Sequence, residues 1–160
     1  MSFRIRGLDP ESFRHLYGAS AAELAAHLAE RQVADAAPGF PDRIRLTDAS
    51  PGETLLLVNH LHQPAANPYR ASHAVYVREG ALEPYDGIDA IPPSLAIRPL
   101  SLRAFDASDR IVDARLVDAR LVDGAEAAGA IEELFRDPRA LYLHAHFARF
   151  GCYAARIERA

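Results

Sequence analysis

Near its end the chain carries three side chains that can serve as nucleophile, base or metal ligand. His144 and His146 are two of the seven histidines, and Cys152 is the single cysteine. The segment 140–148 otherwise has the composition of a strand, in which residues two apart share a face. We therefore expect His144 and His146 to point the same way, with Tyr142 beside them, while the alternate residues face the core.

A second histidine pair has the same spacing. His60 and His62 follow the apolar run 54–58, so they also share one face of a strand. If the two strands are neighbours, the imidazoles of His60, His62, His144 and His146 could converge on a Zn²⁺ or Fe²⁺ ion. The alternative is that these histidines make ordinary hydrogen bonds at the surface of a sheet.

Cys152 allows two interpretations. Its thiol could act as a nucleophile if His144 or His146 removed the proton, and Gly151 would give a substrate room to approach. A lone cysteine in a strand can instead be structural, because cysteine is among the most buried residue types. No second cysteine is present to form a recognisable motif with it.

The loop 63–71 supplies a third candidate. Tyr69 and Arg70 stand together in it, and a planar guanidinium beside an aromatic ring can hold a carboxylate or phosphate. The alternative is that Arg70 anchors its own loop through backbone carbonyls. His73 shares a face with Val75 and Val77 in the strand that follows, which favours a core histidine with satisfied hydrogen bonds.

These residues must be positioned by an α+β fold. At 160 residues the chain fits one domain, 1–160, with a largely antiparallel sheet and helices packed mainly on one side. The apolar run 54–58 suits the middle of the sheet. Caps at Asp9, Ser20 and Asp123 predict three helices, at 10–17, at 21–31 and up to Pro138. The predicted strands are 2–6, 43–46, 54–58, 72–78, 95–105, 110–117, 140–148 and 152–158.

Composition excludes several functions. Lysine is absent, which rules out a Schiff-base lysine, a lysine general base and the lysine of a phosphate-binding P-loop. The net charge is −4 and the arginines are scattered among acids, so we expect no nucleic-acid binding. We also expect no membrane association and a cytoplasmic location, because no apolar run reaches the length of a membrane span and one cysteine forms no internal disulfide.

Three segments together resemble a family of bacterial proteins of about this length that is catalogued as a domain of unknown function, DUF1203. The segments are 3–8, 68–80, and the ending from His144 through the stretch 151–157. The resemblance implies one domain and a bacterial source. It transfers no catalytic role to any residue.

Three functional hypotheses follow from the sequence. The first is a pocket that binds an anionic small molecule, with or without enzymatic turnover, and is lined by Tyr69, Arg70, His144, His146 and Cys152. The second is a metal site formed by the four histidines named above. The third is a non-catalytic interaction protein whose histidine face is an interface between copies of the chain.

Overall fold

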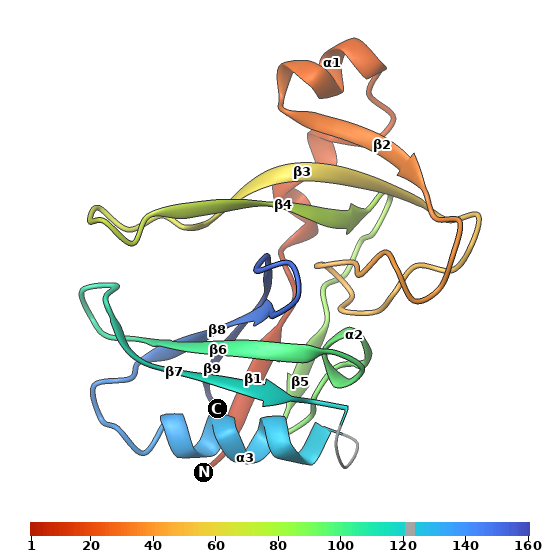
Figure 1. Ribbon diagram of the computed structural model, residues 1–160. Coiled ribbons are helices and arrows are strands. Elements are labelled where there is room, and N and C mark those ends of the chain that lie inside the picture. Colours follow the sequence, from red (N-terminus) through yellow and green to blue (C-terminus); the bar gives the residue numbers. More distant parts are fainter. Residues whose placement is uncertain (121–123) are drawn as a thin grey trace.

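The strands of the protein form two antiparallel sheets that face one another (Figure 1). The computed structural model describes residues 1–120 and 124–160. The larger sheet has six strands in the order β5-β1-β9-β8-β6-β7, and the smaller has three in the order β2-β3-β4. The six are β1 (Phe3–Arg6), β5 (Asp86–Ile88), β6 (Pro99–Phe105), β7 (Ile111–Asp118), β8 (Tyr142–Phe147) and β9 (Tyr153–Arg159), and the three are β2 (Ala29–Val33), β3 (Thr54–Gln63) and β4 (Ala71–Arg78).

The main core lies on one face of the six-stranded sheet. Helix α3 (Ala125–Leu134) covers the face that is turned away from the three-stranded sheet, as Figure 1 shows. Its apolar stripe, which includes Ile131 and Leu134, packs on the buried side chains that the central strands direct toward α3, such as Leu102 and Leu143. Because side chains alternate along a strand, the opposite face of β6 and β8 is left to point toward the smaller sheet.

A second apolar cluster covers the three-stranded sheet. Leu56 and Val58 of β3 and Val75 and Val77 of β4 pack with the N-terminal segment and with Ile44. That segment consists of two short 3-10 turns, Pro10–Ser12 and Arg14–Leu16, followed by α1 (Ala21–Ala26). The remaining helix, α2 (Pro93–Ala96), is a single turn before β6. No helix in the described ranges is long and apolar enough to cross a membrane.

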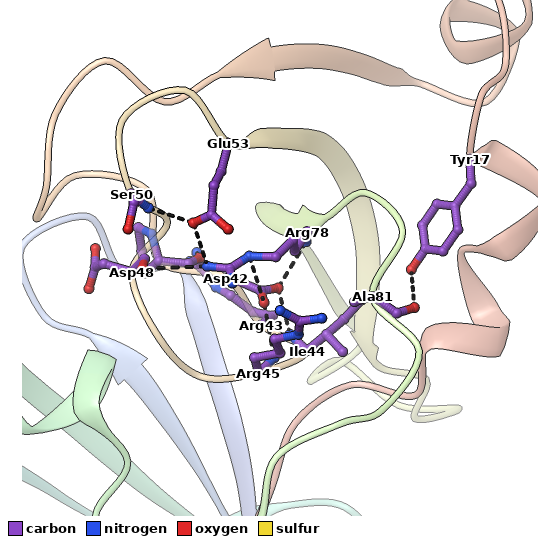
Figure 2. A network of polar contacts seen from close by, with 11 residues as sticks. Tyr17, Asp42, Arg43, Ile44, Arg45, Asp48, Ser50, Glu53, Arg78 and Ala81 are labelled. Carbon is purple, nitrogen blue, oxygen red and sulfur yellow. Dashed lines mark hydrogen bonds and ion pairs between the residues drawn. The ribbon is translucent and has the colours of Figure 1, made fainter.

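The long connection between β2 and β3 is fixed by a buried carboxylate (Figure 2). Asp42 is fully buried and accepts backbone hydrogen bonds from Ile44, Arg45 and Arg78, at 2.9 to 3.0 Å. The Arg78 side chain also pairs with Glu53 at 3.2 Å. Buried ionised groups need such partners, so this network determines where the connection lies against β4.

The α+β class and the largely antiparallel pairing predicted from the sequence are confirmed. The run 54–58 is central, as expected, but in a separate sheet of three strands. The helix predicted over 21–31 is wrong after Ala26: its capping box forms, yet Ala29–Val33 pairs with β3 as β2. The helix predicted over 10–17 is two 3-10 turns, the segment 43–46 is a turn, and Asp123 lies outside the described residues.

Candidate metal centre

Three histidines converge where the two sheets face one another. His62 comes from β3 in the smaller sheet, and His144 and His146 come from β8 in the larger one. One ring nitrogen from each lies within 4.8 Å of the others. The His62 ring centroid is 5.6 Å from that of His144 and 5.2 Å from that of His146, and both rings meet it edge-on. The two-residue spacing on β8 thus places both imidazoles on the face opposite α3, as predicted.

A β-bulge lies at His62, which alternation along β3 already places on the same face as Leu56, Val58 and His60. The β3–β4 ladder pairs Leu61 with Ser72 and then Gln63 with Ala71, so His62 is an extra residue on β3. A bulge breaks the strict alternation of side chains and often lies beside a functional site. Here the bulge brings Gln63 to the same side as His62, although the two residues are adjacent. The Gln63 amide reaches the larger sheet and donates to the Tyr142 hydroxyl at 2.8 Å.

Aromatic rings enclose the three histidines. His73 of β4 stacks on His62 with centroids 4.7 Å apart, and Tyr153 of β9 stacks on His62 at 5.0 Å. Tyr153 also meets His144 edge-on at 5.2 Å. A second bulge, in the β8–β9 ladder after Ala145, pairs Tyr153 with His146 on the inner face. His144 and His146 are therefore at most 1% exposed, and His62 is 9% exposed.

Several nitrogens of these rings lack hydrogen-bond partners. In the described part of the chain, five buried ring nitrogens have none: Nδ1 and Nε2 of His62, Nδ1 of His73, Nδ1 of His144 and Nε2 of His146. Each such group is expected to destabilise the fold by about 1 to 3 kcal/mol, and native proteins hold few of them. All five lie on the four neighbouring rings of His62, His73, His144 and His146.

The tautomer of His146 follows from its one hydrogen bond. Its Nδ1 lies 3.0 Å from the carbonyl oxygen of Gly151. A carbonyl oxygen only accepts, so Nδ1 must carry the proton and donate it. This leaves the lone pair on Nε2, which is buried and has no hydrogen-bond partner. Metal-bound histidines are commonly held this way, with the second ring nitrogen donating to a carbonyl.

Burial keeps all three imidazoles neutral. It lowers the pKa of His62 from 6.5 to about 3, with the nearby His146 and His73 adding to the effect. Burial likewise lowers the pKa of His144 to about 2, and that of His146 to about 4. Neutral imidazole is the form that binds metal, so no proton must be displaced at neutral pH.

The ligand set suits a borderline transition metal. Imidazole binds Zn²⁺, Fe²⁺, Cu²⁺ and Ni²⁺, and a Zn–N bond of about 2.0 to 2.1 Å places tetrahedral ligand atoms about 3.3 Å apart. The observed limit of 4.8 Å is wider than this, so the rings must turn inward to bind an ion. In the described residues no carboxylate or thiol joins the three nitrogens as a ligand.

Of the histidines predicted as metal ligands, the structure brings together His62, His144 and His146. His60 stands at the side, with its ring 5.9 Å from both Phe13 and Tyr153. Sequence reasoning missed His73, for which satisfied hydrogen bonds in the core were expected. Strand parity did place His73 on the face of Val75 and Val77, but its pairing with His60 in the β3–β4 ladder and the missing partner of its Nδ1 have no signal in the sequence.

The other predicted site residues have different neighbours. Arg70 donates to the carbonyl oxygen of Pro64 at 2.9 Å, as expected for an arginine that anchors its own loop, and Tyr69 is exposed. Cys152 accepts a hydrogen bond from the buried Arg43 at 3.1 Å. Within the described ranges none of the three forms a side-chain hydrogen bond with His144 or His146. The anion pocket predicted from the five residues stays a prediction.

The fold and the site together define an α+β protein with a histidine cluster enclosed between two antiparallel sheets. Residues 39–159 match the family described as "Protein of unknown function (DUF1203)". The chain therefore belongs to this family, as the resemblance of its segments indicated, and the matched range includes all three clustered histidines. No curated protein and no solved structure matches the chain.

Proposed function

We propose that the protein binds one divalent transition-metal ion, Zn²⁺ or Fe²⁺, through His62, His144 and His146. The observation that carries this proposal is the set of buried, unpartnered imidazole nitrogens shared by two facing sheets. Binding a metal would satisfy one nitrogen of each ligand and would tie the two sheets together. It would thus turn an unfavourable feature of the fold into a stabilising one.

Three protein ligands leave at least one coordination position for a water molecule or a substrate. Structural zinc sites normally have four protein ligands, whereas catalytic sites keep an open position. A metal held here could polarise a carbonyl or lower the pKa of a bound water toward neutrality. We therefore place the centre in the class of reactive metal sites.

The proposal is tested by metal analysis of the purified protein, before and after anaerobic reconstitution with Zn²⁺ or Fe²⁺. We expect one ion per chain. The single variants His62→Gln, His144→Gln and His146→Gln should each fail to bind this ion while keeping the circular dichroism spectrum of the parent. His15→Gln is the matched control, because His15 is an exposed histidine of the N-terminal segment and should leave the ion bound.

Two results would overturn the proposal. One is the absence of a stoichiometric ion after reconstitution with either metal. The other is equal loss of the ion from His15→Gln and from His144→Gln, which would indicate adventitious binding at the surface. Nitrogen-15 NMR of the imidazoles gives a second readout, since the metal should shift His144 and His146 and leave His15 unchanged.

A further inference from the structure

One arginine lies directly beside the proposed metal centre. Arg103 is on β6, where the ladder with β8 pairs it with His144 and pairs Ser101 with His146. Residues paired across antiparallel strands have Cβ atoms about 4.5 to 5.5 Å apart and point to the same face. Arg103 therefore lies on the inner face of the larger sheet, next to the buried histidines.

Arg103 differs from the other half-buried arginines in having no carboxylate. Arg4 pairs with Asp86, Arg78 with Glu53 and Arg98 with Asp48. In the part of the chain that the structure describes, Arg103 forms no ion pair. Among the described residues its side chain makes one hydrogen bond, a long contact of 3.5 Å from Nε to the Ser101 hydroxyl. A half-buried cation without a counter-charge is unfavourable unless a ligand supplies one.

The charge of the metal-loaded site also favours an anionic ligand. Three neutral imidazoles leave the double positive charge of the metal uncompensated, and Arg103 adds a further positive charge. Arg103 is paired with His144 in the β6–β8 ladder, and its positive charge contributes to the lowered pKa of His62, His73, His144 and His146. Such a concentration of positive charge favours an anion at the open coordination position.

A nearby cavity is a weaker place for an anion. It has a volume of 230 Å³ and its lining includes Arg4, Arg6, Arg156 and Tyr153. Arg4 and Arg6 pair with Asp86, and Arg156 pairs with Glu158 at 2.7 Å. Since the guanidinium groups of this cavity already have carboxylate partners, an anion there would have to compete with them.

We infer that the metal centre takes a small carboxylate, with one carboxylate oxygen on the metal and the guanidinium of Arg103 as the second contact. This inference rests on the proposed metal function and names the class of ligand for its open position. A planar carboxylate matches the planar donor geometry of a guanidinium. The rings of Phe105 and Tyr142 are stacked 5.2 Å apart and both pack against His144.

The test uses the protein loaded with Co²⁺, whose visible absorption reports changes in coordination. Metal content is measured first, for the parent and for Arg103→Gln, Arg103→Lys and Arg110→Gln. Sodium acetate is then titrated into each. We expect a saturable spectral change in the parent and about 10- to 100-fold weaker acetate binding in Arg103→Gln, because one charge-assisted contact is lost. Arg103→Lys should be intermediate.

Arg110→Gln is the matched control, since it removes one exposed positive charge at the turn that precedes β7 and should bind acetate like the parent. Full metal content with unchanged acetate affinity in Arg103→Gln overturns the carboxylate inference alone. Loss of metal from the parent overturns the proposed function and this inference with it. Phosphate is titrated in parallel, and tighter binding of phosphate than acetate would also contradict a carboxylate ligand.

Discussion

The Nδ1 atom of His146 lies 3.0 Å from the carbonyl oxygen of Gly151, five residues further along the chain. This contact joins the proposed metal ligand to the turn between β8 and β9. Gly151 has a φ of 73°, a left-handed conformation that is unfavourable for residues with a Cβ. The orientation of His146 therefore depends on a backbone conformation that glycine adopts readily.

We predict that Gly151→Ala lowers the free energy of unfolding by about 1 kcal/mol and weakens metal binding. Apart from the two chain neighbours, no atom of the described residues lies within 4 Å of the added Cβ, so the effect should come from backbone strain and not from a clash. A shifted partner of a metal ligand typically reduces affinity by about 10- to 100-fold. Urea unfolding and metal titration measure the two effects. Gly151→Asn should be closer to the parent, because asparagine tolerates this conformation; equal loss in both variants would contradict the explanation.

A second prediction concerns His144 in the metal-free protein. His144→Leu should leave the metal-free protein as stable as the parent or more stable, because it removes a buried nitrogen without a hydrogen bond. The same variant should lose the rise in melting temperature that a bound metal gives the parent. Thermal melts with and without Zn²⁺ measure both effects.

Tyr142→Phe is the contrasting variant for this experiment. Its hydroxyl donates to Asp109 at 2.5 Å and accepts from Gln63 at 2.8 Å. Removing it should reduce stability by about 1 kcal/mol with or without metal, since both partners lose a hydrogen bond. If His144→Leu destabilised the metal-free protein more than Tyr142→Phe, the unpartnered nitrogen would not be the unfavourable group that we describe.

The sequence predicts strand parity well and the relation between sheets poorly. The spacing of His144 and His146 was enough to place both on one face, because alternation is a property of the strand itself. Alternation also places His62 on one face with His60, but its approach to His144 depends on how the two sheets pack, and the bulge after Leu61 that brings Gln63 to the same side has no local signal either. The segment 29–33 shows the same limit: pairing with β3 overrides the helical pattern that begins at Ser20.

A third prediction concerns the pH dependence of the contacts of Glu79. Its carboxylate accepts from Arg31 of β2 and from the backbone of Gly18, each at 2.8 Å, which ties the end of β4 to β2 and to the N-terminal segment. The hydrogen bonds from Arg31 lower the pKa of Glu79 below 4.5, against the opposing effect of burial. A lowered carboxyl pKa stabilises the fold above pH 4.5, and this stabilisation is lost as the pH falls through the folded-state value.

Glu79→Gln should therefore be less stable than the parent at pH 7, by on the order of 1 kcal/mol, and the difference should shrink at pH 3. Urea unfolding at the two pH values measures this. Glu11→Gln removes an exposed partner of Arg14 and should have little effect at either pH. A difference for Glu79→Gln that grew on acidification would show that the sign of the pKa shift is wrong.

The last prediction concerns Arg43, which is 2% exposed and links the connection before β3 to the start of β9. Its guanidinium donates to the carbonyl oxygens of Tyr153, at 2.9 Å, and Pro41, at 2.5 Å, and to the Cys152 sulfur at 3.1 Å. Arg43→Met would leave these buried acceptors without their donor. We expect the free energy of unfolding to fall by roughly 3 kcal/mol or more.

Arg43→Met should also weaken metal binding, because Cys152 directly follows the glycine whose carbonyl orients His146. Arg45→Met is the matched control, since Arg45 is exposed and should change stability by less than about 0.5 kcal/mol. Cys152→Val tests the same connection between Arg43 and His146 and removes only the sulfur that accepts a hydrogen bond from Arg43. Unchanged metal affinity in Cys152→Val, together with a folded and metal-binding Arg43→Met, would separate Arg43 from the orientation of His146.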